Sequence, residues 1–342
     1  MKAAILRGPR QVEFGNRADP VPVPGEVLVQ VKAVGICGSD LHVYRHGGFG
    51  NIVVNDLVQG HEPAGVVMEL GAKVQHLKIG DRVAIEPGIY CGCCEPCLTG
   101  RPNICPDVKY LSAQSVDGAF CEYLARPESR LLALPESLDF EEGAMLEPLA
   151  VGVHAVRTSK LRLGDHVVIL GAGSIGLTIL QAARCAGATR IYVFDRLDHR
   201  LEVAKRLGAD AVGNIDQVDP LEMLREWTHG RLCDRVFEAA GEPESFSLAV
   251  RMPALGGTVV LVGLCAGEVS LPLDRARLGE VNILSLRREA HAYKAALELV
   301  ESGRIDVKSM VTHRFPLSRT GEAMEIAASY ADRAVKVMVN PA

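Results

Sequence analysis

The sequence predicts an α/β protein of two domains, one rich in β-strands and one built on a doubly wound parallel sheet. Its length of 342 residues favours two domains. Short β-branched or alternating segments, separated by Gly, Pro and Asp, fill residues 1–90 and predict strands. Near residue 150 the pattern changes to apolar runs that alternate with helical periodicity, which predicts parallel strands buried on both faces.

The composition excludes several classes of protein. Contents of 48% hydrophobic and 23% charged residues are typical of a globular chain and exclude intrinsic disorder. The net charge of −5 offers no basic face for nucleic acid. No apolar stretch is long enough to span a bilayer, and the N-terminal segment lacks a secretory signal. We therefore expect a cytoplasmic protein with no nucleic-acid or membrane partner.

In the β-rich part, we expect strands over residues 1–6, 26–36, 62–70 and 81–87. Three prolines within residues 19–26 predict an extended connection between the first two of these strands. The second part contains apolar runs at 166–170, 190–195, 234–241, 256–264 and 282–288. We place a dinucleotide-binding domain at 151–284. A catalytic domain is assembled from 1–150 and 285–342, and its tail adds an amphipathic helix within 292–305, a further helix and a closing strand.

The motif GAGSIG at residues 171–176 follows a predicted strand and opens a predicted helix, which is the context that a dinucleotide-binding turn requires. Gly171 allows the tight turn, Gly173 lets a pyrophosphate approach the backbone, and Gly176 lets helix and strand pack closely. Ser174 and Ile175 begin the helix, whose N-terminal N–H groups bind phosphates. The alternative is a turn that uses glycine for packing only.

Asp195 ends the next predicted strand, 19 residues after Gly176. A carboxylate in this place hydrogen-bonds the adenosine ribose hydroxyls and repels a 2′-phosphate, which favours NAD over NADP. Arg196 follows directly and would soften that preference. Arg200 lies one helical turn further, within reach of the adenine side.

Five of the ten cysteines lie between residues 91 and 105. Four of them have the spacing C-x2-C-x2-C-x7-C, which can wrap one tetrahedral Zn²⁺ with no open position. We therefore predict a structural zinc lobe at 88–106, with Cys91, Cys94, Cys97 and Cys105 as its ligands. Cys93 is a fifth thiol and should point away from the metal. A reduced cysteine-rich loop without metal is the alternative.

A second set of metal-binding side chains is spread along the first domain. Cys37 ends a predicted strand, and His61 and Glu62 precede another. One thiolate, one imidazole and one carboxylate suit a catalytic Zn²⁺ that keeps a position open for water or substrate. Glu147 could bind the same metal or hold its water. Each residue alone could be an ordinary buried side chain, since buried Cys is common.

These residues resemble the zinc-dependent medium-chain alcohol dehydrogenase superfamily over essentially the whole chain. The likeness is carried by GICGSDLH, GHEPAGVV, GDRVAIEPG, EPLAVGVHA, ILGAGSIGLTILQAAR and the four-cysteine lobe. The chain is most similar to the sorbitol/xylitol (polyol) dehydrogenase branch. Glu147 stands where simple alcohol dehydrogenases place a third metal-binding cysteine, Ser39, His42 and Tyr44 follow Cys37, and VTHRFPL occurs at 311–317.

The resemblance implies a GroES-like catalytic domain, a Rossmann domain and an NAD-linked interconversion of a polyol and a ketose. With both metal sets filled, each subunit would hold one catalytic and one structural Zn²⁺. Members are usually homodimers or homotetramers, and we expect one of these states. The likeness places five residues near the nicotinamide half of the cofactor: Val262, Gly263, Leu264, Leu286 and Arg287.

In this reaction we expect Ser39 to take the proton released by the alcohol and His42, whose ordinary pKa suits the task, to deliver it to solvent. A plain surface histidine is the alternative for His42. Further substrate hydroxyls would be bound by Tyr44, Tyr110 and Arg288. The chain departs from the family at Glu289, where an aromatic residue is usual, so the sorbitol pocket is in question. Arg287 and Glu289 could instead form a surface ion pair.

Three other functions compete with this interpretation. A threonine or simple alcohol dehydrogenase would use the same scaffold, although Glu147 and Tyr44 argue against a simple alcohol. A zinc-free quinone or enoyl reductase would use NADPH, and four residues together argue against it: Cys37, His61, Glu62 and Asp195. A non-catalytic protein that binds zinc and a nucleotide would need the four-cysteine lobe but not the open metal set.

Overall fold

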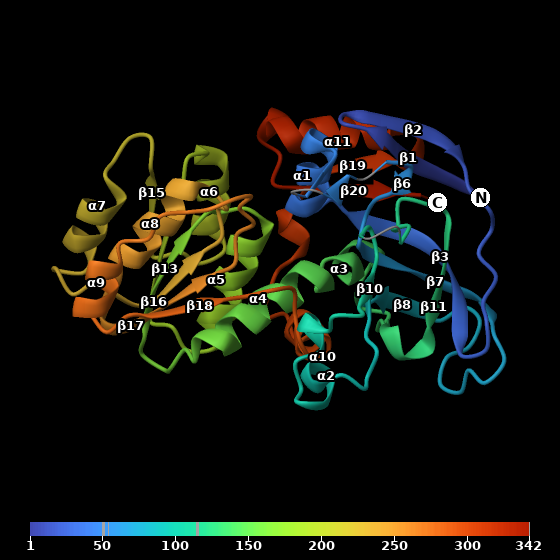
Figure 1. The fold of residues 1–342 in the computed structure, drawn as a ribbon, viewed down its shortest axis with the longest axis horizontal. Helices are drawn as coiled ribbons and strands as arrows, with labels where there is room; N and C mark the ends of the chain where they lie inside the picture. Colours follow the sequence, from blue (N-terminus) through green and yellow to red (C-terminus); the bar gives the residue numbers. More distant parts are fainter. Residues whose placement is uncertain (50–51, 54, 114–115, 342) are drawn as a thin grey trace. The chain divides into compact units, whose positions relative to one another are not determined.

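The structure is a computed structural model that describes residues 1–49, 52–53, 55–113 and 116–341. The chain divides into two compact units. The first comprises Met1–Glu147, Tyr293–Gly303 and Val307–Ala342, and the second comprises Pro148–Ala292 and Arg304–Asp306. Both chain termini therefore belong to the first unit (Figure 1).

The second unit extends past the limits of 151–284 that we expect from the sequence. The guanidinium of Arg157 donates to the carbonyl of His291 at 3.0 Å, which ties the segment after residue 284 to this unit. The side-chain amide of Gln181 exchanges two hydrogen bonds with the backbone of Asp306, at 3.0 and 2.8 Å. These long-range bonds have no signature in the local sequence pattern, so the sequence alone does not record them.

The first unit is built around one large sheet with the strand order β12-β8-β7-β3-β20-β19, in which β11 also pairs with β3. β3 is antiparallel to β7, β11 and β20, so the C-terminal strand lies beside a strand from the start of the chain. The strands of this sheet are β3 (Glu26–Gly35), β7 (Glu62–Leu70), β8 (Arg82–Ile85), β11 (Tyr123–Pro127), β12 (Leu131–Ala133), β19 (Val311–Pro316) and β20 (Lys336–Asn340).

Smaller sheets and short helices complete the first unit. The order β2-β1-β6 forms one sheet, and β9-β10 and β4-β5 each form an antiparallel two-stranded sheet. Their strands are β1 (Lys2–Gly8), β2 (Gln11–Asn16), β4 (Gly48–Phe49), β5 (Ile52–Val53), β6 (Leu57–Val58), β9 (Gly88–Ile89) and β10 (Lys109–Tyr110). The helices are α1 (Gly38–His46), α2 (Glu95–Leu98), α3 (Phe140–Ala144), α10 (Tyr293–Glu301) and α11 (Thr320–Ser329). The four strands expected from the sequence in this part all occur.

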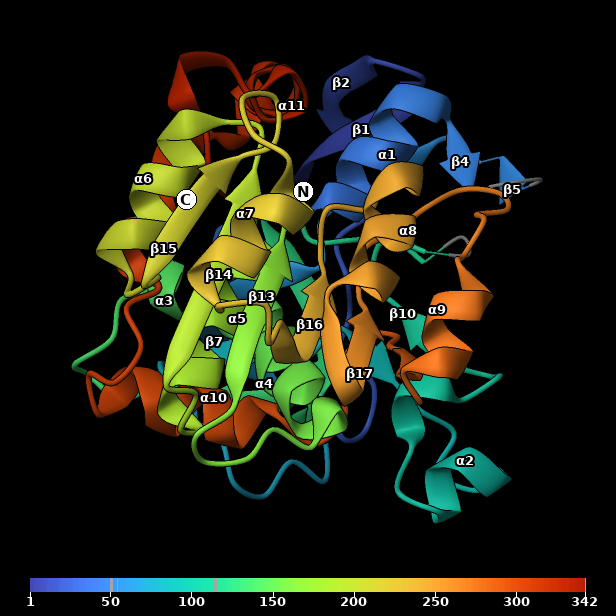
Figure 2. The same ribbon diagram turned by 90° about the vertical axis from the view of Figure 1, so that its left-hand side faces the viewer.

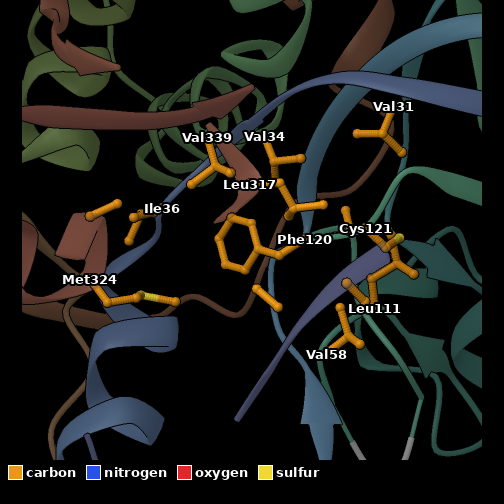
Figure 3. Close-up of a cluster of buried hydrophobic side chains, with 14 of the residues drawn as sticks. Val31, Val34, Ile36, Val58, Leu111, Phe120, Cys121, Leu317, Met324 and Val339 are labelled. Carbon is orange, nitrogen blue, oxygen red and sulfur yellow. The ribbon is translucent and has the colours of Figure 1, made fainter. Parts of the chain in front are cut away.

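The core of the first unit joins residues from both ends of the chain. Phe120, which is 1% exposed, lies among apolar side chains of the N-terminal strands and of the C-terminal segment (Figure 3). Its neighbours in the figure include Val34, Ile36, Leu317 and Met324. Burying these side chains is the main force that holds the two separated stretches of sequence in one unit.

The second unit is a parallel sheet with the order β15-β14-β13-β16-β17-β18. Figure 2 labels its strands from β15 to β17. The chain runs from β13 outward to β15, then returns beside β13 with β16 and continues to β18. The strand order therefore reverses between the neighbouring strands β13 and β16, which makes their carboxyl ends the topological switch point of the sheet. The strands are β13 (His166–Leu170), β14 (Arg190–Asp195), β15 (Ala211–Asn214), β16 (Cys233–Glu238), β17 (Pro253–Leu261) and β18 (Asn282–Ser285).

Helices pack against this sheet as the alternating pattern predicts: α5 contacts β13, α6 contacts β14 and β15, and α8 contacts β16 and β17. The helices are α5 (Ser174–Cys185), α6 (Asp198–Arg206), α7 (Pro220–Trp227), α8 (Pro243–Arg251) and α9 (Leu273–Leu278). α4 (Leu146–Ser159) begins in the first unit and continues into the second. Within the described part of the chain, none of the helices combines the length and the apolar character needed to cross a membrane.

Replacing Phe120 by alanine should destabilise the first unit by about 3–5 kcal/mol, because the change leaves a cavity in a core that cannot collapse around it. Urea unfolding followed by circular dichroism measures the loss. Phe14→Ala is the matched control, since that ring is 44% exposed and its removal leaves no cavity. Equal losses for the two variants would contradict the central place of Phe120 in the core.

Candidate active site

The first unit brings three metal-binding side chains together. The ligand atoms of Cys37, His61 and Glu62 all lie within 4.8 Å of one another, although the residues come from two separate stretches of sequence. His61 and Glu62 are buried, and Cys37 is partly exposed. A thiolate, an imidazole and a carboxylate are ligands that Zn²⁺ takes in proteins, so this donor set fits a catalytic zinc ion.

The local backbone explains how the three residues meet. Cys37 follows β3 and precedes α1, while His61 and Glu62 stand at the start of β7, whose Glu62 pairs with Gly35 of β3. A Cβ atom on Gly35 would lie 2.0 Å from the carboxylate of Glu62, so only glycine leaves room for this side chain. Gly60 has a φ of +91°, which turns the chain just before His61.

Asp40 supports this set, and sequence reasoning overlooked it. It is 1% exposed, and its carboxylate accepts the N–H groups of Cys37 at 3.0 Å and Gly60 at 3.3 Å. One carboxylate oxygen lies 3.4 Å from Nδ1 of His61. Burial alone would raise the pKa of Asp40, but His61 and the two N–H groups lower it overall. Asp40 therefore orients the imidazole so that its other nitrogen is free to bind a metal.

Lys336 is a second residue that sequence reasoning missed. Its ammonium group forms an ion pair with the carboxylate of Glu62 and also donates to the carbonyl of Ile36 at 3.0 Å. Both charged side chains are only 1% exposed. A buried carboxylate without a counter-charge is costly, so Lys336 supplies the counter-charge that Glu62 needs in the interior. Only the pairing of β20 with β3 brings this lysine to the site.

Glu147 lies in the first turn of α4 and is buried. The hydroxyl of Tyr110 donates to its carboxylate at 2.9 Å, and the Tyr110 ring centroid lies 5.8 Å from that of His61. Burial raises the pKa of Glu147 to about 7; the charge of Glu62 adds to the rise, while His61 and Tyr110 oppose it. Glu147 therefore neighbours the three metal-binding side chains without being part of their compact set.

Ser39 and His42 lie three residues apart on α1 and so share one face of that helix. The His42 ring is 4.8 Å from that of His46, and partial burial together with His46 and Arg45 lowers the pKa of His42. Tyr44 is placed differently. It is 3% exposed in the core, and its hydroxyl donates to Glu325 at 3.0 Å, an arrangement that does not support the predicted contact with substrate.

The predicted lobe brings its four thiols together: the sulfurs of Cys91, Cys94, Cys97 and Cys105 lie within 4.8 Å of one another. The sulfur of Cys91 is 3.9 Å from that of Cys97 and 3.5 Å from that of Cys105. Sulfurs around a tetrahedral zinc with bonds of about 2.3 Å lie about 3.8 Å apart, so the geometry fits the metal. The N–H groups of Cys93 and Cys94 lower the pKa of the Cys91 thiol to about 6, which favours the thiolate.

In the second unit, the glycine-rich turn connects β13 to α5. Gly171 has a φ of +99°, and a Cβ atom on Gly176 would lie 1.8 Å from the carbonyl oxygen of Gly171. A Cβ atom on Gly173 would meet only a guanidinium nitrogen of Arg200, at 3.7 Å, so space remains above this residue. The buried carboxylate of Asp195 accepts the N–H of Ala172 at 2.6 Å, which places it beside the turn.

The remaining predicted cofactor residues follow strand ends in the second unit. Val262, Gly263 and Leu264 come directly after β17, and Leu286 and Arg287 come after β18, so both segments leave the same edge of the sheet. Arg288 adopts a left-handed conformation with a φ of 57°. Glu289 is 4% exposed and accepts the N–H of Ala292 at 3.0 Å, so it is an interior residue.

Comparison with known proteins places this arrangement in a family. The model for the alcohol dehydrogenase GroES-like domain matches residues 23–136, and the model for zinc-binding dehydrogenases matches residues 174–302. The sorbitol dehydrogenase of Bacillus subtilis (strain 168) is 40% identical over 347 residues, which cover 100% of this chain and 97% of that protein.

Two solved structures share the fold and were determined with a nicotinamide cofactor. A protein of Sinorhizobium meliloti 1021, assigned as a zinc-binding dehydrogenase and bound to NADP, has a TM-score of 0.92 and 32% identity, covering 99% of each chain. An alcohol dehydrogenase of Escherichia coli CFT073 complexed with NADH has a TM-score of 0.92 and 31% identity, covering 100% of this chain and 99% of the other. The GroES-like and Rossmann folds expected from the sequence are thus confirmed, and the chain belongs to the zinc-dependent medium-chain alcohol dehydrogenase superfamily as an oxidoreductase of its polyol dehydrogenase branch.

Proposed function

We propose that the protein oxidises a secondary alcohol of a sorbitol- or xylitol-like polyol to a ketose, with NAD as the hydride acceptor and zinc as the catalytic metal. The observation that carries the proposal is the compact set of Cys37, His61 and Glu62 in a chain that also holds a glycine-rich turn beside Asp195. The full-length likeness to a sorbitol dehydrogenase supports the substrate class.

Cys37, His61 and Glu62 would hold the catalytic zinc, and Glu147 would stand next to it. When bound, zinc acts as a Lewis acid that lowers the pKa of an alcohol hydroxyl and so prepares the carbon for hydride loss. Lys336 neutralises Glu62, and Asp40 orients His61. The four lobe thiols would close around a second, structural zinc, giving two metal ions per subunit.

NAD would bind with its pyrophosphate at the start of α5 and its adenosine ribose at Asp195. When bound, the nicotinamide accepts the hydride, and the protein supplies orientation. Gly173 leaves space for the pyrophosphate, and the Arg200 guanidinium lies beside it. The carboxylate of Asp195 would repel the 2′-phosphate of NADP, which favours NAD even though a relative of this fold was determined with NADP.

The alcohol proton would leave through Ser39 and then His42, which share a face of α1. The lowered pKa of His42 keeps the imidazole neutral and able to take a proton near pH 7. Tyr110, beside Glu147, and Arg288 remain our candidates for binding further substrate hydroxyls. We also propose that the protein works in the cytoplasm as a homodimer or homotetramer.

Turnover tests the proposed reaction. The purified protein should reduce NAD with at least one of sorbitol, xylitol, ribitol or galactitol, and more slowly with threonine or ethanol. Cys37→Ser should abolish this turnover while the affinity for NADH, measured by fluorescence, stays unchanged. Cys185→Ser is the control, since this exposed thiol belongs to neither metal set. Wild-type rates in the Cys37 variant would refute the catalytic zinc, and preference for ethanol or threonine would refute the substrate class.

Cys97→Ser should lower the zinc content from two ions per chain to one and reduce the melting temperature, because the lobe loses the metal that closes it. Atomic absorption and thermal unfolding measure the two effects. Cys93→Ser changes an exposed thiol of the same lobe and should keep both ions. A content of one ion in the wild type, or equal effects of the two variants, would contradict the structural site.

Asp195→Ala should weaken NAD binding by about tenfold and narrow the preference over NADP, because the ribose loses its acceptor and the 2′-phosphate loses a repelling charge. Dissociation constants for NADH and NADPH, measured side by side, give the ratio. Asp216→Ala removes an exposed carboxylate from the same unit and serves as the control. An unchanged ratio in the Asp195 variant would exclude the ribose contact.

A further inference from the structure

Glu238 is a fully buried carboxylate in the second unit that the proposed reaction leaves unused. It is the last residue of β16 and has no exposed surface. Its strand pairs with β13, and Glu238 stands opposite Leu170, the residue before the glycine-rich turn. Glu238 therefore lies at the carboxyl edge of the sheet, at the point where the winding reverses and where such sheets bind their ligands.

The carboxylate of Glu238 ties together two loops that follow neighbouring strands. One oxygen accepts the N–H groups of Ala240 at 2.9 Å and Gly241 at 2.8 Å, and also the hydroxyl of Ser245 at 2.6 Å. The other oxygen lies 3.2 Å from the N–H of Gly263, which it accepts. The first three partners follow β16 and the fourth follows β17. The backbone carbonyl of Glu238 also accepts the N–H of Gly263, at 3.0 Å, so Glu238 holds both loops through its side chain and its backbone together.

The two loops also touch each other without room for side chains. A Cβ atom on Gly263 would lie 2.4 Å from the Glu238 carboxylate and 2.5 Å from the nitrogen of Gly241. A Cβ atom on Gly241 would lie 2.6 Å from the carbonyl oxygen of Leu264. The backbone of these loops is therefore held in contact through Glu238, and small changes there would shift Gly263 and Leu264.

The loop after β16 in turn abuts the glycine-rich turn. The N–H of Ala239 donates to the carbonyl of Leu170 at 2.8 Å, and a Cβ atom on Gly171 would lie 2.8 Å from the carbonyl group of Ala239. The turn that would bind the pyrophosphate and the loop that would line the nicotinamide are thus connected through residues 239–241. Among the described residues, Glu238 is the only one whose carboxylate accepts hydrogen bonds both from the segment 239–241 and from Gly263.

Burying a carboxylate costs free energy, and most loops are held in place without a buried charge. Four donors offset the cost here, and the burial still raises the pKa of Glu238 above its ordinary value. We propose that Glu238 is a positioning residue for the nicotinamide half of the cofactor: it holds the loops after β16 and β17 at the spacing that this half requires. The inference rests on the proposed use of NAD. It goes beyond that use by assigning Glu238 to the binding of the nicotinamide half and not to the binding of the ADP-ribose half.

Glu238→Gln tests the proposal through binding. The amide nitrogen cannot accept an N–H, so the side chain must lose its bond to one of the two loops while its shape and the backbone bond to Gly263 are kept. NADH contains the nicotinamide and ADP-ribose lacks it. The variant should bind NADH about tenfold more weakly, a change of about 1.4 kcal/mol, and should bind ADP-ribose within about twofold of the wild type. Titration calorimetry measures both affinities.

The matched control is Glu244→Gln, which removes the same charge from an exposed position in the first turn of α8 and should leave both affinities unchanged. Equal weakening of NADH and ADP-ribose, or no weakening of either, in the Glu238 variant would overturn the proposal. A wild-type protein that binds neither ligand would instead refute the proposed use of NAD, so the two failures are distinguishable.

A second variant covers the case in which Glu238→Gln does not fold. In Gly263→Ala the carboxylate stays intact, and the new methyl group forces the two loops apart, because its position lies 2.4 Å from the carboxylate. This variant should also bind NADH more weakly than the wild type and keep its affinity for ADP-ribose. Unchanged NADH affinity in a folded Gly263→Ala protein would show that the spacing of the loops does not matter, and would likewise overturn the proposal.

Discussion

The buried ion pair between Glu62 and Lys336 is the interaction on which the structure of the first unit depends. The two residues are 274 positions apart in sequence, and both are 1% exposed. Removing one partner of such a pair costs about 3–5 kcal/mol, because the other charge is left in the interior. The pair therefore forms only when β20 lies beside β3, which couples completion of the fold to the pairing of a buried carboxylate.

The second unit uses carboxylates in the same manner, with backbone N–H groups in place of a cation. Asp195 ends β14 and holds the glycine-rich turn through Ala172, while Glu238 ends β16 and holds the loops around Gly241 and Gly263. Both are buried at the carboxyl edge of the sheet. Because an unpaired carboxylate there would be unstable, each one helps to fix the geometry of the loops that would line the proposed cofactor site.

Local signals in the sequence explain what could be predicted. The GAGSIG turn and the four-cysteine spacing are short patterns with one physical meaning each, and the structure brings both sets of residues together. Lys336 could not be found, because its role depends on a strand pairing that no local spacing records. The substrate contact predicted for Tyr44 stays a prediction. Its place after Cys37 suggests the substrate site, whereas the bond of its hydroxyl to Glu325 of α11 is a tertiary contact that the local sequence does not record.

The two metal-binding sets differ in what holds them before any metal binds. Cys37, His61 and Glu62 are supported by Asp40, Lys336 and the absence of a side chain at Gly35, so the protein itself supplies their geometry. The lobe cysteines all lie within one short stretch, and α2 within it has no buried residue. A stretch with so few buried residues would gain much of its stability from a metal, whereas the geometry of the other set is held by the surrounding protein. This contrast is why the buried set suits catalysis and the lobe suits structure.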